Sequence, residues 1–358
     1  MKNLASLKRI RENRLFWPLV AWVLILLFDA IFSPGFFKIG ILDGHLYGNL
    51  IDVVNNSAPL MLVAIGMTMV IATGGVDLSV GAVIAISAAM GAVLINPALG
   101  QKLITNDILT KDMTNTPLWI IVLADLAAGT ACGLWNGLLV SRGKIQPMVA
   151  TLILMVAGRG IAQLITNGQI MTIYYTPYFY FGNGFILGLP VSIYIVAIVF
   201  LIAWALVRKT SIGLFVESVG INAKATYYSG ISEKNIKLLA YTFCGFCAAI
   251  AGLILSSYVH SADGNNNGLN YELDAILAVV IGGTLMAGGR FSLFASVLGA
   301  LIIWTFTITM YTFGVPANAL LAARAVLVLV VILLYSDYTR QIINRLFERR
   351  GSQHDATN

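Results

Sequence analysis

Long apolar segments recur along the whole chain and restrict the fold more than any other feature. Stretches close to 20 residues follow one another from Trp17 to Tyr335, and about 20 apolar residues are what an α-helix needs to cross a bilayer. Of the 358 residues, 58% are hydrophobic and 11% are charged, whereas soluble domains carry about 25% charged residues. No segment shows the alternating polarity of a transmembrane barrel. The chain is therefore predicted to be an all-α polytopic membrane protein.

The apolar pattern predicts about ten transmembrane helices in one domain, residues 17–335. The predicted spans are 17–33, 54–73, 79–95, 118–140, 147–166, 190–207, 238–258, 272–288, 293–311 and 319–335. The third, eighth and last of these spans are shorter than 20 residues, so we expect them to be tilted, broken or partly enclosed by protein.

The distribution of basic residues predicts the orientation. Cytoplasmic segments of membrane proteins are enriched in Lys and Arg. With the N-terminus inside, 17 of the 22 Lys and Arg residues lie in cytoplasmic segments and three lie in external loops. The basic N-terminus 1–16, the loop 208–237 and the tail 336–358 are therefore predicted to be cytoplasmic. No A-x-A-like cleavage site follows the first apolar segment, so this segment is read as an uncleaved helix.

The net charge of +6 therefore reflects membrane topology, and no nucleic-acid partner is expected. The three cysteines lie in apolar segments with no histidine nearby. We expect helix packing for them and predict neither a metal site nor a disulfide framework.

Two glycine-rich elements interrupt the apolar pattern. VIATGGVDLSVGA at 70–82 and VVIGGTLMAGGRFS at 279–292 each place a glycine pair between two apolar runs. Glycine permits positive φ and close backbone approach, and interrupted helices in transporters often mark the substrate or gating region. The residues proposed as hinges are Gly74, Gly75, Gly81, Gly282 and Gly283.

The first of these elements contains a carboxylate in apolar surroundings, Asp77, with Ser79 two residues further on. An aspartate just before a helix caps its free backbone N–H groups. An intramembrane carboxylate also marks solute pathways. Capping of the following helix and contact with a passing solute are compatible interpretations.

The cytoplasmic segment 210–237 contains a compact helical unit. Asn222 is a candidate N-cap, 223–229 a short helix and Gly230 its terminator. Such a helix is too short to be stable alone. It is predicted to dock into a partner protein, the alternative being a surface turn packed on its own bundle.

Polar residues within the predicted spans form a second group of candidates. Arg159, Gln163 and Thr166 lie on one helix stripe, which either lines a hydrophilic path or forms a structural hydrogen-bond network. Asn136 is expected to join helices. Glu272 and Asp274 are interpreted as helix-capping residues rather than a cation site.

Arg324 is predicted either to pair with a carboxylate or to line an interface. The sequence also lacks certain motifs: a nucleotide-binding G-x-x-x-x-G-K-[ST] loop, H-E-x-x-H and G-x-S-x-G. If ATP drives this protein, another polypeptide hydrolyses it.

Four ordered motifs resemble a known family. GGVDLSVG at 74–81, NGLLVSRGKIQPMVATLILMVAGRG at 136–160, VGINAKATYYSGI at 219–231 and YELDAILAVVIGG at 271–283 are similar to the sugar-type branch of bacterial ABC-importer permeases, which serve ribose, arabinose, xylose and galactosides. Within that branch the chain looks most like the permeases of galactofuranose importers.

The resemblance implies a type II importer permease fold in the bacterial inner membrane. It implies two permease subunits, as a heterodimer or a homodimer, with a periplasmic sugar-binding protein and ATP-binding subunits that carry ATP and Mg, while this chain binds no cofactor and is no enzyme. It further implies a coupling element that engages the ATPase. The residues of that element, with its terminating glycine, are Glu217, Gly220, Ile221, Asn222, Ala225 and Gly230.

Three alternatives stay open at this stage. The cargo is a monosaccharide resembling galactofuranose, or instead a pentose or nucleoside carried by the same mechanism. An ion-coupled secondary transporter would need a buried carboxylate, for which Asp125 and Asp77 qualify. A membrane enzyme is disfavoured by the missing catalytic motifs.

Overall fold

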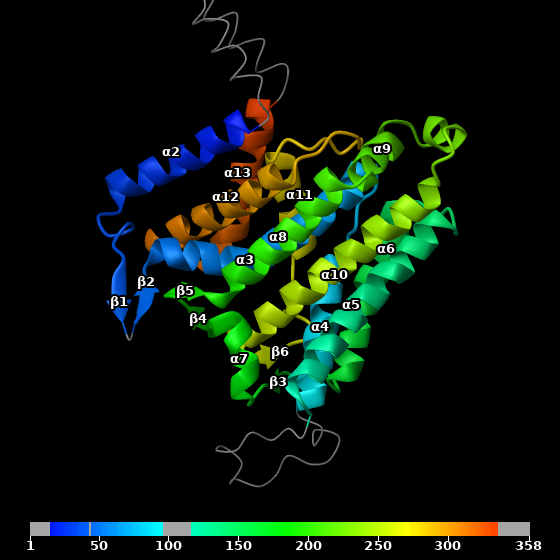
Figure 1. The fold of residues 1–358 in the computed structure, drawn as a ribbon. Helices are drawn as coiled ribbons and strands as arrows, with labels where there is room; N and C mark the ends of the chain where they lie inside the picture. Colours follow the sequence, from blue (N-terminus) through cyan, green and yellow to red (C-terminus); the bar gives the residue numbers. More distant parts are fainter. Residues whose placement is uncertain (1–14, 43, 96–115, 336–358) are drawn as a thin grey trace, which may run out of the picture.

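The fold is a bundle of helices with a few very short strands (Figure 1). A computed structural model describes residues 15–42, 44–95 and 116–335. The helices are α2 (Phe16–Phe32), α3 (Asn49–Ala72), α4 (Val80–Ile95), α5 (Leu118–Ser141), α6 (Pro147–Ile165), α7 (Thr176–Asn183), α8 (Val191–Lys209), α9 (Ile212–Tyr228), α10 (Glu233–Val259), α11 (Tyr271–Ile281), α12 (Leu293–Thr312) and α13 (Ala317–Tyr335). The predicted N-terminal segment up to residue 14 and the tail 336–358 lie outside the described residues.

Six helices are long and apolar enough to cross a membrane: α3, α5, α6, α8, α10 and α12. Shorter apolar helices are α2, α4 and the segment Asn318–Leu327 of α13. The class predicted from the sequence, a polytopic helical membrane protein, agrees with these elements. The predicted number of about ten spans is not confirmed, because six helices of the described chain meet the length requirement.

The eighth predicted span, 272–288, is wrong as a continuous helix. The helix there, α11, ends at Ile281 after 11 residues, which is roughly 16 Å at 1.5 Å per residue and about half of a bilayer core. Gly283 has a φ of +77°, which ends the helical path, and α12 begins only at Leu293. The glycine-rich element at 279–292 therefore interrupts the helices, as predicted. The interruption covers residues 282–292 and is longer than the gap 289–292 between the two predicted spans.

The central helices are α3 and α10, which pack against each other; α3 also packs against α12, and α10 against α4 and α5. In the most apolar 18-residue segment of α3, 83% of the residues are buried, against 22% in the corresponding segment of α5. α3 therefore lies in the core, and α5 presents apolar side chains outward. A helix that is apolar on all sides lies either in a protein core or in a membrane. The contact between α3 and α10 is close because a Cβ at Gly66 would lie 2.8 Å from Cα of Cys244.

The largest helix contact, between α5 and α10, depends on small residues. Gly129, Gly133 and Gly137 repeat every fourth residue on α5, and a Cβ at Gly133 would lie 2.5 Å from the carbonyl oxygen of Tyr241. Gly245 of α10 faces this stripe, and a Cβ at Gly245 would lie 2.4 Å from the carbonyl oxygen of Gly129. Small residues at every fourth position let membrane helices approach to backbone contact.

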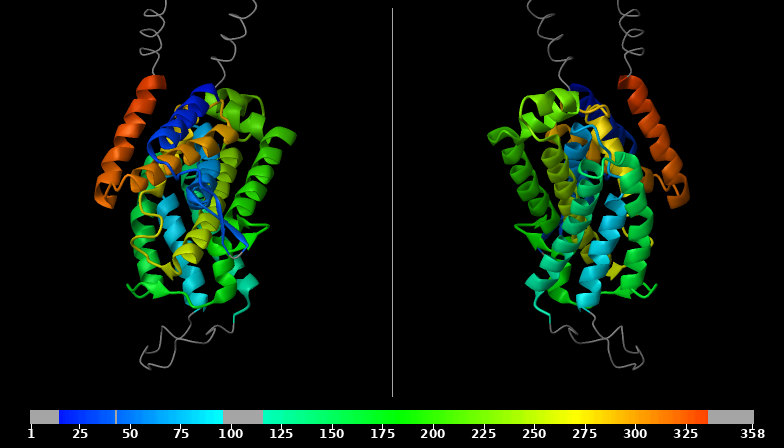
Figure 2. Two further views of the ribbon diagram at one scale, coloured as in Figure 1. Left: turned by 90° about the vertical axis from the view of Figure 1, so that its left-hand side faces the viewer. Right: turned by 90° about the vertical axis from the view of Figure 1, so that its right-hand side faces the viewer.

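Three two-stranded antiparallel sheets, β1–β2, β3–β6 and β4–β5, are a small departure from the all-α prediction. The strands are β1 (Gly40–Leu42), β2 (His45–Tyr47), β3 (Met171–Thr172), β4 (Phe185–Ile186), β5 (Leu189–Pro190) and β6 (Ser261–Ala262). Figure 1 shows α9 at one end of the bundle, whereas α7, β3 and β6 lie at the other end. In both views of Figure 2, α13 lies at the edge of the bundle.

We expect Gly133→Ala to destabilise the protein by roughly 1–3 kcal/mol, because the added methyl group has no room between α5 and α10. The matched control is Gly160→Ala in α6, where a Cβ would meet no atom within 4 Å. The measurement is thermal unfolding of both variants in detergent. Equal melting temperatures for the two variants would contradict the close packing of α5 on α10.

Candidate functional site

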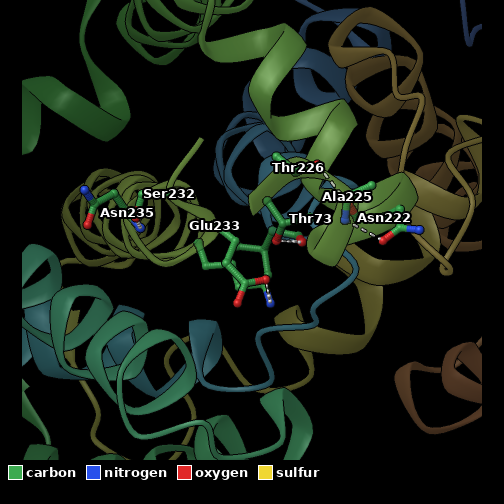
Figure 3. Close-up of polar contacts among 9 residues, drawn as sticks. Thr73, Asn222, Ala225, Thr226, Ser232, Glu233 and Asn235 are labelled. Atoms are coloured by element: carbon green, nitrogen blue, oxygen red, sulfur yellow. Dashed lines mark hydrogen bonds and ion pairs between the residues drawn. The ribbon is translucent and has the colours of Figure 1, made fainter. Parts of the chain in front are cut away.

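The predicted coupling element forms part of α9, which is kinked at Asn222. The backbone of Asn222 is non-helical, with φ −157° and ψ 97°. Its Oδ1 accepts a hydrogen bond of 3.0 Å from the backbone N–H of Ala225 (Figure 3), and Gly230 has a φ of +83°. The predicted cap, short helix and glycine stop are therefore confirmed. The sequence did not predict the first half of α9, residues 212–221.

The outer surface of this element carries exposed apolar side chains. Ile221 is 70% exposed and Tyr228 is 87% exposed, and Tyr227 beside them is also exposed. Glu217 is half-buried, and within the described chain its side chain forms no hydrogen bond or ion pair. Thr226, in contrast, is buried and donates to the carbonyl oxygen of Asn222 at 2.9 Å. One side of the coupling element is thus packed against the rest of the protein, and the other side is exposed.

Gly220 connects α9 to both glycine-rich breaks. The N–H of Gly289, in the second break, donates a hydrogen bond of 2.9 Å to the carbonyl oxygen of Ala72, the last residue of α3. A Cβ at Gly220 would lie 1.9 Å from that oxygen and 2.3 Å from that nitrogen. A Cβ at Gly288 would lie 2.8 Å from N of Gly74. We call these four glycines, 74, 220, 288 and 289, the glycine junction.

Three glycines of the junction have backbone conformations that other residues rarely adopt. The φ angles are +80° at Gly74, +89° at Gly288 and +94° at Gly289. A side chain at these positions would be strained. The junction therefore requires glycine for conformation at three positions and for space at Gly220.

Three other glycines predicted as hinges are surrounded by different groups, each of which leaves no room for a side chain. Gly75 lies against the phenol of Tyr241, whose OH donates to Val76 O at 3.3 Å. Gly282 packs on the backbone of α12. Gly81 lies within α4, and a Cβ there would overlap the carboxylate of Glu272 and the carbonyl of Gly268. Among the predicted hinges, positive φ angles occur only at Gly74 and Gly283; whether any of the five moves stays a prediction.

Asp77 is buried in the first break, where its side chain is hydrogen-bonded to neighbouring residues. Its Oδ1 accepts hydrogen bonds from the backbone N–H of Ser79 at 2.9 Å and from the Ser79 hydroxyl at 2.6 Å. Asn136 of α5 donates to the Ser79 hydroxyl at 2.7 Å. Asp77 therefore caps the start of α4, and Asn136 joins α5 to this turn, as the sequence suggested. Asp77 and Ser79 are both almost fully buried, so contact with a solute stays a prediction.

The polar stripe of α6 holds the loop that precedes α11. The Arg159 guanidinium donates to the carbonyl oxygens of Asn265, at 3.1 Å, and Asn267. The amide of Gln163 donates to the side-chain oxygen of Asn265. The hydroxyl of Thr166 instead donates to the carbonyl oxygen of Ala162 in its own helix, at 3.2 Å. Arg159 and Gln163 thus form a structural network, and Gln163 and Thr166 also line a small polar pocket with this loop.

The same loop is stabilised by a carboxylate at its start. Oδ1 of Asp263 accepts from the backbone N–H groups of Asn265 and Asn266, at 2.8 and 3.2 Å. Burial raises the pKa of the Asp263 carboxyl, but these hydrogen bonds and the charge of Arg159 bring the pKa below its usual value. Asp263 is thus ionised at neutral pH and balances the guanidinium.

The capping interpretation is wrong for Asp274, whereas the Glu272 carboxylate does interact with a backbone N–H in the first turn of α11, that of Glu272 itself. The N-cap residue Asn270 makes no capping hydrogen bond through its side chain. Asp274 forms an ion pair of 2.8 Å with Arg324 of α13. Glu272 lies against Gly81, so the first turns of α4 and α11 meet. Of the two predictions for Arg324, the carboxylate partner is confirmed.

The predicted site residues therefore lie in separate places. The coupling residues share one segment at the end of the bundle, next to Gly74; Asp77 and Ser79 lie with Asn136; Arg159, Gln163 and Thr166 lie along the loop before α11. Gly288 and Gly289 were not predicted as contact residues, although both lie in the motif 279–292. Among the described residues, no group of three or more His, Cys, Asp or Glu residues is placed to hold a metal ion.

Comparison with known proteins identifies the class. Residues 49–335 match the family described as "Branched-chain amino acid transport system / permease component", and the chain belongs to this family. The match includes both glycine-rich breaks and the whole of α9. The site described above is therefore part of a transport permease.

Curated relatives cover nearly the full length. The chain is 46% identical over 331 residues to the galactofuranose transporter permease protein YtfT of Escherichia coli K12, covering 91% of this chain and 92% of that protein. It is 37% identical over 355 residues to the fructose import permease protein FruF of Bifidobacterium longum, covering 98% and 95%. It is 33% identical over 319 residues to the ribose import permease protein RbsC of Escherichia coli K12, covering 88% and 91%. No solved structure matches the chain.

We expect Asn222→Ala to loosen the short helix that follows the kink. Loss of an N-cap costs about 1 kcal/mol, which should make the amides of 225–228 exchange roughly fivefold faster. Asn222→Asp keeps an acceptor oxygen and is the matched control. Hydrogen–deuterium exchange of the two variants measures the difference. Unchanged exchange in Asn222→Ala would show that packing, rather than the cap, holds this helix.

Proposed function

We propose that this chain is the inner-membrane permease subunit of an ATP-driven sugar importer, with its N- and C-termini in the cytoplasm. In this proposal the chain hydrolyses nothing. An ATP-binding subunit carries ATP and Mg, a second permease subunit completes the pathway, and a periplasmic binding protein delivers the sugar. The contact of Gly220 with Ala72 and Gly289 is the observation that supports this proposal most.

This contact connects the exposed surface of α9, at Ile221 and Tyr228, directly to the helix bundle. A partner that presses on Ile221 and Tyr228 displaces Gly220, and Gly220 has no free space on its inner side. The displacement is therefore passed to the end of α3 and to the second break, which leads into α12. A rigid, backbone-to-backbone contact of this kind transmits small movements because it has no side chain that can yield.

The surface of the coupling element suits an ATPase partner. Exposed Ile221, Tyr227 and Tyr228 supply apolar area, and aromatic residues are enriched in the centres of protein interfaces. Glu217 is available for a basic group of the partner. Proposed in this way, Glu217, Ile221 and Ala225 contact the ATPase, whereas Gly220, Asn222 and Gly230 set the shape of the element.

The proposed cargo is a monosaccharide related to galactofuranose. This rests on the relative that is 46% identical, a galactofuranose transporter permease. The alternative is fructose or a pentose such as ribose, from the other two relatives. Transport leaves every bond of the sugar intact. ATP must then drive the difference in affinity between an outward-open and an inward-open state.

Uptake into proteoliposomes tests the proposal. The chain is purified with its co-expressed partners and reconstituted, and uptake of labelled D-galactose, D-ribose and D-fructose is measured. We expect uptake of at least one sugar only when ATP, the ATP-binding subunit and the sugar-loaded binding protein are all present. Uptake driven by a proton or sodium gradient without the ATPase would contradict the proposal and favour a secondary transporter, for which the buried Asp125 of α5 is a candidate.

We expect Gly220→Ala to uncouple ATP hydrolysis from uptake. The new methyl group must displace α9 from Ala72 and Gly289, which shifts the surface that meets the ATPase. Uptake per ATP should fall by about tenfold, equivalent to roughly 1.4 kcal/mol, while membrane insertion is retained. Gly160→Ala is the same substitution at an open position and should behave as wild type. A wild-type ratio of uptake to hydrolysis in Gly220→Ala would remove the assigned role.

A further inference from the structure

The polar pocket between the end of α6 and the loop before α11 has room for a small polar ligand. Its volume is about 250 Å³, several times the roughly 30 Å³ that one water molecule occupies in the liquid. Strands β3 and β6, which flank the pocket in the chain, lie at the opposite end of the bundle from α9 (Figure 1). We call it the outer pocket. Its polar side chains are those of Gln163, Thr166, Gln169, Asp263, Asn265 and Asn266.

The two segments that form the outer pocket are fixed to each other. β3 and β6 form an antiparallel pair, with Ile170 just before β3 and Asp263 just after β6. A Cβ at Gly264 would lie 2.9 Å from the backbone nitrogen of Gln163, so the loop packs directly on α6. The guanidinium of Arg159 also binds carbonyl oxygens of this loop. The walls of the pocket are therefore formed by the protein before any ligand binds.

Several polar atoms of the outer pocket are available to a ligand. The Gln163 amide donates to Oδ1 of Asn265, and within the described chain no hydrogen bond involves Oε1 of Gln163 or Nδ2 of Asn265. The side chain of Gln169 is exposed and likewise has no hydrogen-bond partner among the described residues. Oδ2 of Asp263 accepts from Nδ2 of Asn266 at 2.6 Å and can accept a second hydrogen bond. The pocket thus offers both donors and acceptors.

This set of polar groups suits a neutral ligand that carries several hydroxyl groups. A hydroxyl both donates and accepts, and a carboxamide side chain does the same, so the two can bond in either direction. A carboxylate accepts a hydrogen bond from a hydroxyl more strongly than a neutral group does. Because the charge of Asp263 is balanced by that of nearby Arg159, the pocket favours a neutral ligand over a cation.

The loop of the outer pocket is connected to both glycine-rich breaks. The loop continues into α11, which ends at the break that contains Gly289. The loop also lies against the start of α4, because a Cβ at Gly81 would lie 2.4 Å from the carbonyl oxygen of Gly268. α4 in turn follows the break that contains Gly74. A displacement of the glycine junction therefore reaches the pocket along two helices.

We propose that the outer pocket is the site at which the permease first binds the transported monosaccharide, with Gln163, Gln169 and Asp263 bonding its hydroxyl groups. This inference rests on the proposed function and adds the residues that take the sugar from the binding protein. Of the side chains that line the pocket, Ile170 is the one apolar group for the C–H faces of the sugar. Binding is therefore weak, which suits onward movement. Movement of α4 and α11 during the ATP cycle alters the pocket and promotes release.

The direct test measures sugar binding to the permease–ATPase complex in nanodiscs without the binding protein. Saturation-transfer NMR detects weak binding, and the probes are D-galactose, D-ribose and D-fructose. We expect at least one of them to bind the wild type and to bind Gln169→Ala about fivefold more weakly, the size expected for one lost hydrogen bond between neutral groups. Asp263→Asn should weaken binding further, because hydrogen bonds to a charged acceptor are roughly twice as strong. The matched control is Gln146→Ala, an exposed glutamine at the start of α6 whose side chain makes no cap hydrogen bond.

Uptake by the complete reconstituted importer is the second measurement. With saturating sugar-loaded binding protein and ATP, we expect uptake to fall in Gln169→Ala and in Asp263→Asn. ATP hydrolysis stimulated by the binding protein should be retained in Gln169→Ala, because this side chain bonds to nothing else within the described chain. Gln146→Ala should match the wild type in binding, uptake and hydrolysis.

The possible failures are distinguishable. A wild-type importer that takes up sugar, with unchanged binding and uptake in Gln169→Ala, would overturn the pocket assignment alone. A loss confined to Asp263→Asn would belong to that outcome, because Asp263 would then act through the fold of its loop. An equal loss in Gln146→Ala would also overturn the assignment, because the effect would not be specific to the pocket. A complete wild-type importer that takes up none of the sugars would contradict the proposed function and this assignment with it.

Discussion

The hydrogen bond from the amide of Gly289 to the carbonyl of Ala72 is the constraint on which the rest of the arrangement depends. It closes the end of α3 with a donor from a loop more than 200 residues further along the chain, and Gly220 lies directly over it. A carbonyl at a helix end needs such a partner when it is enclosed by protein. Because glycine alone fits at this contact, three separate segments are held in one arrangement.

The interior follows the same rule of close approach. α5 meets α10 through glycines at every fourth residue, α3 meets α10 at Gly66, and α4 meets α11 at Gly81. Between membrane helices the hydrophobic effect contributes little, so dispersion contacts at short range and buried hydrogen bonds such as Asn136 to Ser79 provide the cohesion. Bulky apolar side chains are correspondingly found on the outer faces of α5, α6 and α8.

Several ionisable groups of the interior have partners nearby, whereas among the described residues one carboxylate oxygen each of Asp29, Asp125 and Glu272 has none. Asp77 is satisfied by a turn, Arg159 by loop carbonyls and Asp274 by Arg324. In the proposed importer, the force for transport would come from outside the bundle through α9.

The sequence by itself determined the membrane class, nine of the ten apolar helices in outline, the two breaks and the Asn222 cap, since these depend on local composition, on hydropathy over about 20 residues and on side-chain-to-backbone bonds within a few residues. Tertiary structure alone decided that α11 stops halfway, that Asp274 pairs with Arg324 of α13 while Glu272 lies against Gly81 of α4, and that Gly220 meets Gly289. Those features depend on which distant segments come within bonding distance, and neither spacing nor hydropathy carries that information.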